Sequence, residues 1–249
     1  MFIIAAGVLG AILGSFLNAL LFRYNTGRSV AAGRSRCMSC GHTLAPLDLV
    51  PVLSYAVLLG KCRYCQSHIS VQYPLVEALS ALLAVALYVR NPEPLHFFLS
   101  LFVWMVLLFV LVYDLRHKII PWSAMGLAIL GAGALLVLDR EFTSEALTAG
   151  VALAAPLLLL SAVSRGTWMG WADGVLEFGL GLLLGLSAGA SALVMAFWIG
   201  AVVGITLLIL PRGYTMKSEV PFAPFLILGA ALSYFLHVDF LQTLPALFF

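Results

Sequence analysis

Long apolar runs separated by short polar interruptions fill almost the whole chain. A run of about 20 apolar residues is long enough for a helix to cross the hydrocarbon core of a bilayer. The runs lack the alternation of a barrel strand, and backbone groups in lipid must be paired within the protein, so the pattern predicts helices. Eight spans are predicted, at residues 2–22, 74–89, 95–114, 121–138, 147–163, 174–188, 190–210 and 221–237.

The composition leads to the same class of protein. Hydrophobic residues make up 63% of the chain and charged residues 10%, which excludes a soluble globule. The expected fold is therefore an all-α polytopic membrane protein with about eight transmembrane helices. Its parts are a first helix at residues 1–22, a small loop domain at 23–73, and a seven-helix membrane domain at 74–249.

The positive charges predict the orientation of the spans. If the spans alternate, eleven of the thirteen Lys and Arg residues share the side of the 23–73 loop. They are Arg23, Arg28, Arg34, Arg36, Lys61, Arg63, Arg116, Lys118, Arg165, Arg212 and Lys217, against Arg90 and Arg140 on the other side. By the positive-inside rule, this side faces the cytoplasm. These charges are topology signals in a lipid bilayer, so the net charge of +2 predicts no nucleic-acid partner.

All four cysteines lie in the predicted loop, in two pairs of the same spacing. Cys37-Met-Ser-Cys40 and Cys62-Arg-Tyr-Cys65 each place two thiols on one tight turn, and 21 residues separate the pairs. Two such turns can make a tetrahedral sulfur site, and a loop of about 50 residues needs a staple. We therefore predict a structural zinc, with redox pairs or unliganded thiols as alternatives. Disulfides are disfavoured in the reducing cytoplasm, and a catalytic zinc would need an open coordination position.

Two aspartates stand at the ends of apolar runs. Asp114 closes the third predicted span and Asp173 opens the sixth, so both arrive at the same membrane face. An ionisable side chain within a span is costly and indicates a functional site by default. A simpler interpretation is that Asp114 is a boundary charge. Glu177 lies one helical turn beyond Asp173, where it is either a third acid or a packing residue.

Two facing carboxyl groups point to acid–base chemistry. Such a pair shares a proton, as in aspartic proteases, where one carboxylate activates water and the other protonates the reacting group. The helix dipoles favour an anionic Asp173 as the base and Asp114 as the acid. A proton-coupled transporter is the rival class. The acids, however, lie near one face and no inverted repeat is obvious.

Two further features predict local packing. Gly10 and Gly14 have the small-xxx-small spacing of a close helix contact, and Gly181, Gly185 and Gly189 repeat it in the sixth span. At the start of the second span, Glu77 is expected in the first helical turn, where the dipole favours a carboxylate. A substrate-site role for Glu77 is the alternative.

Taken together, the loop and the aspartates resemble the type IV prepilin peptidases, membrane aspartic proteases named after a Gly-x-Gly-Asp motif. The marks of the resemblance follow one another along nearly the whole chain. They are Gly14-Ser-Phe-Leu-Asn18, Arg36-Cys-Met-Ser-Cys-Gly-His42, Asp48-Leu-Val-Pro-Val-Leu-Ser54, Cys62-Arg-Tyr-Cys65, Tyr73-Pro-Leu-Val-Glu77, Asp114 with Ile120-Pro121, and Pro221-Phe-Ala-Pro-Phe225.

The resemblance implies a substrate, a location and the site residues. Family members cleave the leader of type IV prepilins and type II secretion pseudopilins at the cytoplasmic face of the bacterial inner membrane. Many also methylate the new N-terminal residue with S-adenosylmethionine. By resemblance, Asp114 and Asp173 match the two catalytic aspartates. Cys37, Cys40, Cys62 and Cys65 match the zinc-binding loop.

Two positions depart from the family pattern. The Gly-x-Gly-Asp motif reads Gly170-Trp-Ala-Asp173, and Ala172 adopts left-handed backbone angles less readily than glycine. Val175 stands where the family usually has a lysine. A diverged peptidase-only or inactive member is therefore an alternative to the full peptidase and N-methyltransferase.

Overall fold

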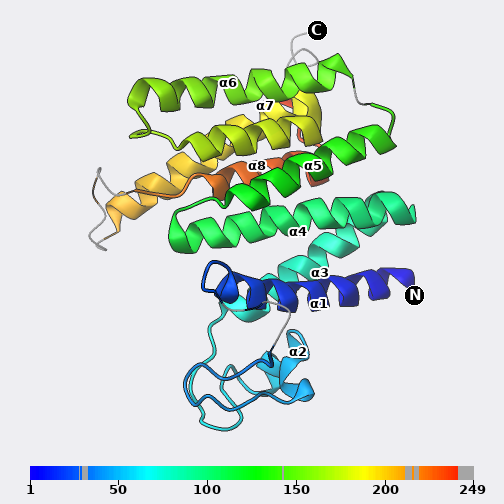
Figure 1. Cartoon of the computed structure of the whole chain (residues 1–249), viewed down its shortest axis with the longest axis vertical. Coiled ribbons are helices and arrows are strands. Elements are labelled where there is room, and N and C mark those ends of the chain that lie inside the picture. Colours follow the sequence, from blue (N-terminus) through cyan, green and yellow to red (C-terminus); the bar gives the residue numbers. More distant parts are fainter. Residues whose placement is uncertain (28, 30–32, 142, 211–214, 216–218, 241–249) are drawn as a thin grey trace. The chain divides into compact units, whose positions relative to one another are not determined.

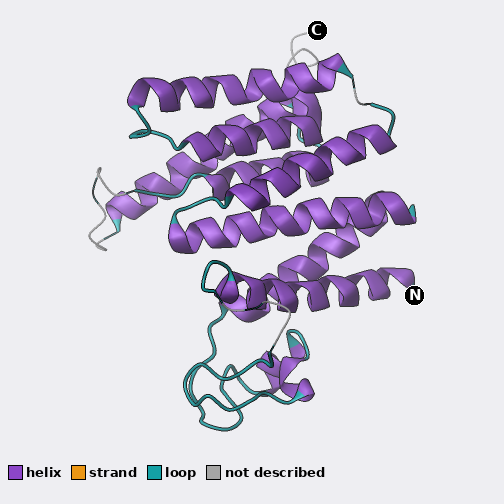
Figure 2. Cartoon of the chain, viewed as in Figure 1, coloured by secondary structure: helices purple, strands orange, loops and turns teal. Residues whose placement is uncertain are grey.

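The computed structural model describes the whole chain except residues 28, 30–32, 142, 211–214, 216–218 and 241–249. Its regular elements within the described residues are all helices (Figure 2). The chain forms two compact units, Met1–Leu101 and Phe102–Phe249, which are described separately. The all-helical membrane class predicted from the apolar runs is confirmed.

The first unit is built on two helices that pack closely. They are α1 (Phe2–Arg23) and α3 (Gln72–Arg90), which lie side by side (Figure 1). A Cβ on Gly14 would lie 2.8 Å from the Cα of Glu77, closer than real side chains come. The expected small-residue contact is therefore confirmed, with α3 as the neighbour.

The segment between α1 and α3 is mostly irregular. It contains a short 3-10 helix η1 (Pro46–Leu49) and a five-residue helix α2 (Leu53–Val57). The unit ends with the beginning of α4 (Pro94–His117), whose Phe97 packs edge-on against Tyr88 of α3.

The second unit contains the rest of α4 and four further helices (Figure 1). These are α5 (Trp122–Leu138), α6 (Ser144–Ser164), α7 (Trp171–Ile209) and α8 (Ala223–Leu236). Small residues again allow two helices to approach closely: a Cβ on Gly181 of α7 would lie 2.8 Å from the Cα of Gly150 of α6. Trp104 of α4 is buried against the rings of Tyr234 and Phe235 at the end of α8.

The long helix α7 folds back on itself at Gly185. This glycine has φ 75° and ψ 179°, far from helical values. A Cβ on Gly189 would lie 3.8 Å from the Cα of Gly181, whereas eight residues of straight helix rise about 12 Å. α7 therefore consists of two apolar segments, as the predicted spans 174–188 and 190–210 require. The prediction that Gly185 belongs to a packing face is wrong, because its Cβ would meet nothing within 4 Å.

Most span boundaries agree with the predictions to within a few residues. α1, α3, α4, α6 and α7 are long and apolar enough to cross a membrane, while α5 and α8 are shorter apolar helices. The prediction for Glu77 is wrong: α3 begins at Gln72, so Glu77 falls in the second turn. Arg28, Arg212 and Lys217, which contributed to the predicted orientation, lie outside the described residues.

Candidate active site and metal centre

Asp114 lies in the last turns of α4 and is 4% exposed. Its carboxylate accepts a hydrogen bond from the backbone N–H of Ala223, the first residue of α8. Ala223 is itself fully buried. The first N–H groups of a helix have no partner within the helix, so this contact satisfies an orphan donor and places Asp114 at the positive end of α8.

Asp173 is the third residue of α7 and is 8% exposed. Its Oδ2 accepts the backbone N–H of Gly170 at 3.2 Å, so the side chain reaches back to the N-cap as in a capping box. Ala172 lies within the helix and has no positive φ. Alanine in place of the motif's second glycine therefore requires no unusual backbone conformation here.

The two aspartates come from different helices of the same unit. Their charges are close enough to interact, although 58 residues of chain lie between positions 114 and 173. Within the described part of the chain neither aspartate forms an ion pair. Two buried carboxyl groups without a cation hold one negative charge at lower cost than two, so such a pair shares a proton. This is the arrangement required for one acid and one base.

The contact between Asp114 and Ala223 was not foreseen from the sequence. The dipole argument had set Asp114 at an unfavourable helix C-terminus and Asp173 at a favourable N-terminus. In the structure each carboxylate accepts one backbone N–H at a helix N-terminus, so the donors do not distinguish the acid from the base. The signal that was available is Pro224 in the first turn of α8, since proline is common where a helix begins.

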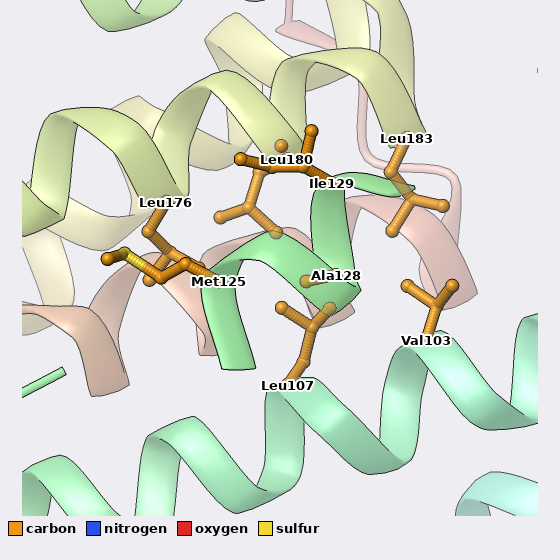
Figure 3. A pocket seen from close by; sticks show the side chains of 9 residues that line it. Val103, Leu107, Met125, Ala128, Ile129, Leu176, Leu180 and Leu183 are labelled. Carbon is orange, nitrogen blue, oxygen red and sulfur yellow. The ribbon is translucent and has the colours of Figure 1, made fainter. Parts of the chain in front are cut away.

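Glu177 lies one turn after Asp173 and is 1% exposed. Its Oε1 is buried without a hydrogen-bond partner among the described residues. A cavity lies between α4, α5 and α7, and side chains from all three helices point into it (Figure 3). Its volume, counted as the space open to the centre of a water molecule, is about 10 Å³, and its lining residues include Leu107, Met125 and Leu180.

The four cysteines converge at one point of the first unit. Their Sγ atoms all lie within 4.8 Å of one another, and those of Cys37 and Cys65 are 3.8 Å apart. Sulfurs at the corners of a tetrahedron about 2.3 Å from its centre are about 3.8 Å apart, which is the geometry of a Cys₄ zinc site. No cysteine is in a disulfide. The residues therefore fit a zinc ion, as the spacing predicted.

The two cysteine turns have the same backbone geometry. The N–H of Cys37 donates to the carbonyl of His42 and that of Cys62 to the carbonyl of Ser67, each at 2.9 Å. In each turn the residue after the second cysteine has a positive φ, 70° at Gly41 and 59° at Gln66. A hydrogen bond from the backbone N–H of Cys40 contributes most to lowering the pKa of the Cys37 thiol to about 6, whereas desolvation and the neighbouring cysteines raise the pKa of the Cys40 thiol to about 11.

An ion pair joins the second cysteine turn to the segment between the two turns. Asp48 of η1 accepts the Nε–H of Arg63 at 2.7 Å and the hydroxyl of Tyr64 at 3.1 Å. The hydrogen bond from Arg63 lowers the pKa of Asp48, so this carboxylate stays charged in the ordinary pH range. The Asp48-to-Ser54 stretch named in the resemblance is thus tied to the second cysteine turn.

Glu77 connects this loop to the membrane helices. Its Oε2 accepts the backbone N–H of Val52 at 2.7 Å, and the hydroxyl of Ser15 in α1 donates to the same carboxyl group. Val52 has φ 61°, a strained conformation for a β-branched residue that costs about 1–3 kcal/mol. Glu77 is therefore an anchor that holds a strained turn against α1 and α3. This anchoring role replaces the interaction with the helix dipole that was expected for Glu77.

Replacing Glu77 with leucine is expected to release the loop. The half-buried N–H of Val52 would lose its partner, which costs up to about 1–3 kcal/mol, and its strained conformation would no longer be held. Glutamine keeps an accepting oxygen and should retain most of the attachment. The release of the loop is measured by limited proteolysis of the 24–71 segment in the purified full chain. Equal protection in the wild-type and leucine proteins would contradict the anchor role.

The fold and these two centres define a class of protein: a polytopic membrane protein with a buried aspartate pair in one unit and a four-cysteine loop in the other. A family model described as the bacterial peptidase A24 N-terminal domain matches residues 8–91. No solved structure matches the chain.

Three similar proteins all carry the name prepilin leader peptidase/N-methyltransferase. The protein of Bacillus subtilis (strain 168) is 30% identical over 228 residues, covering 91% of each chain. That of Aeromonas hydrophila is 34% identical over 199 residues, covering 78% of this chain and 68% of its own. That of Burkholderia pseudomallei (strain 1026b) is 32% identical over 266 residues, with 94% and 85% covered. The chain belongs to the prepilin leader peptidase/N-methyltransferase family.

Proposed function

We propose that this protein is an aspartic endopeptidase that removes the leader peptide of type IV prepilins or pseudopilins, with Asp114 and Asp173 as its catalytic pair. The observation that carries the proposal is that these two buried carboxyl groups, from separate helices, lie close enough for their charges to interact, in a chain of this family. The chemistry of the pair and the names of the relatives support the same reaction.

The pair can perform the hydrolysis without any other ionisable group. The carboxylate of one aspartate takes a proton from water, and the resulting hydroxide attacks the scissile carbonyl carbon while the other aspartate donates its proton to the carbonyl oxygen. The amide nitrogen leaves with the proton taken from water. As the tetrahedral intermediate collapses to the carboxylic acid, one of its hydroxyl groups returns a proton to the aspartate that had protonated the carbonyl oxygen, so the pair regains its single shared proton. The N–H groups of Gly170 and Ala223 hold the two carboxylates in place throughout.

The site is proposed to face the cytoplasm from the bacterial inner membrane. The positive-inside bias of the sequence supports this orientation. Asp114 and Asp173 lie at the ends of their apolar helices, so a hydrophilic leader can reach them from the aqueous side while the following hydrophobic segment stays in lipid. The substrates are prepilins or pseudopilins, and the bilayer is the other partner.

We propose a structural zinc ion held by Cys37, Cys40, Cys62 and Cys65. When bound, the metal supplies a fixed crosslink between the two cysteine turns, and four thiolate ligands leave no position for a reacting water. A closed site of this kind gives the metal no part in the proposed hydrolysis. The proposed role of the metal is to stabilise the fold of the loop.

Methylation of the new N-terminal residue with S-adenosylmethionine is the second proposed activity. It rests on the names of the relatives, because the described cavity of about 10 Å³ is far too small for this methyl donor. The residues around that cavity therefore have no part in the proposed methyl transfer.

One incubation tests both activities. The purified protein in lipid is mixed with a model prepilin and isotopically labelled S-adenosylmethionine, and the product is followed by intact-mass spectrometry. We expect loss of the leader mass and gain of one labelled methyl group. Cleavage without the methyl group would identify a peptidase-only member. No cleavage of any prepilin tested, by a folded protein, would overturn the proposed function.

A further inference from the structure

Glu177 is a buried carboxyl group that the proposed hydrolysis leaves unused. It is 1% exposed, and its Oε1 has no hydrogen-bond partner in the described part of the chain. A carboxyl group buried without a partner is expensive, and it is held as the neutral acid because burying its charge would cost far more. A leucine would fill such a position at no polar cost. The presence of a glutamate at this position therefore indicates a function for its carboxyl group.

The surroundings support neither of two simple uses. Among the described residues, the side chains that group closely enough to hold an ion are the four cysteines, and Glu177 is not one of them. Glu177 is also not among the residues that line the cavity between α4, α5 and α7. That cavity is lined by apolar residues such as Leu176 and Leu180 (Figure 3), and a water there would lack the polar partners it needs.

The nearest acid along the helix is Asp173. Residues four apart on a helix lie on one face with Cβ atoms about 5–6 Å apart, so side-chain rotation alone can bring the two carboxyl groups together. Asp173 accepts the N–H of Gly170 through Oδ2, and no bond to its Oδ1 is formed within the described residues. A neutral carboxyl group has one O–H to donate, and the aspartate has an oxygen free to accept it.

We propose that Glu177 is the third acid of the site, a positioning residue whose O–H donates a hydrogen bond to the anionic carboxylate of Asp173 during catalysis. The proton stays on Glu177, so no charge is moved. The bond holds Asp173 as the base and leaves Asp114 to donate its proton. This inference rests on the proposed peptidase function and assigns a role to a residue outside its catalytic pair.

Few other charges can influence this pair from the neighbouring helices. α7 itself carries only Asp173 and Glu177, and α5 carries no ionisable side chain. The remaining ionisable side chains of α4, α6 and α8 in this unit are Tyr113, Asp114, Arg116, His117, Glu145 and Tyr234. Of these, Asp114 is the one whose charge acts on Asp173. The pH dependence of cleavage thus reports chiefly on the three acids.

The test compares glutamine and leucine at position 177 in the full-length protein with a model prepilin. Glutamine can still donate to Asp173, whereas leucine has a similar volume and cannot. We expect Glu177→Gln to keep kcat within about threefold of wild type. We expect Glu177→Leu to lower kcat at least tenfold with KM unchanged, and to move the acid limb of the pH–rate profile to higher pH. We also expect Glu177→Leu to melt at a higher temperature than wild type, because an unpaired polar group is removed.

A merely structural glutamate gives the opposite order. In that case leucine would be at least as active as glutamine, with an unchanged pH profile, and this result would overturn the inference. Trp104→Phe is the matched control, since Trp104 Nε1 is also buried without a partner among the described residues but lies ten residues before Asp114 on α4, about 15 Å away. It should alter stability alone. Retained cleavage in Asp173→Asn would instead mean that the proposed function itself has failed.

Discussion

Replacing either Asp114 or Asp173 with asparagine is expected to lower the rate of leader cleavage by at least about 100-fold. Asparagine has the shape of aspartate, and its amide oxygen can still accept the N–H of Ala223 or Gly170, so the fold should persist. It cannot take a proton from water or give one to the carbonyl. The measurement is the rate of leader removal from a model prepilin, with melting temperature recorded for each variant.

The control for these variants is Asp139→Asn. Asp139 is the exposed C-cap of α5 and takes no part in the site, so this change should leave cleavage unaffected. The double variant Asp114→Asn with Asp173→Asn is the decisive case. If it still removed leaders at more than a few per cent of the wild-type rate, hydrolysis by an acid pair would be wrong, whatever the family of the chain.

The parts of the fold that depend on local pattern could be predicted from the sequence. Span length follows from the number of consecutive apolar residues, so most helix ends agree to within three residues. The convergence of the cysteines could also be predicted, because two turns of equal spacing that each carry two thiols are typical of a tetrahedral metal site. The alternation of spans was also enough to predict that Asp114 and Asp173 lie at the same membrane face, because the number of spans between them determines which helix ends share a side.

The parts that depend on contacts between distant residues could not be predicted. No local pattern tells that the carboxylate of Glu77 accepts a hydrogen bond from Val52, because the strained φ of Val52 exists only in the folded loop. The turn at Gly185 was assigned to packing because the same spacing of glycines serves both purposes. Likewise, the sequence shows the position of Glu177 on the helix, but not that its Oε1 is buried without a partner among the described residues.

The two units place the proposed chemistry and the proposed metal in different parts of the chain, and this makes them separately testable. The aspartates lie in Phe102–Phe249, and the cysteines and Glu77 in Met1–Leu101. Loss of the metal should therefore act through the stability of the loop. The aspartate variants, in turn, should retain their metal in full.

Changing Cys37 and Cys40 together to serine is expected to reduce the zinc content of the purified protein from about one ion per chain to none. Two remaining thiolates, Cys62 and Cys65, cannot complete a tetrahedral site. Structural zinc sites contribute about 10–16 kcal/mol of apparent binding free energy near neutral pH, so the loop should unfold. Metal analysis and limited proteolysis of the 24–71 segment measure the two effects.

His68→Ala is the matched control for the cysteine variant. His68 is exposed beside the second cysteine turn and is the kind of residue that can replace a thiolate as a zinc ligand. Because four sulfurs already surround one point, its removal should leave the zinc in place. A chelator should lower the melting temperature of wild type and of His68→Ala equally, and leave the double serine variant unchanged. Zinc retained by the double serine variant, or lost from His68→Ala, would show that the four sulfurs do not make up the site.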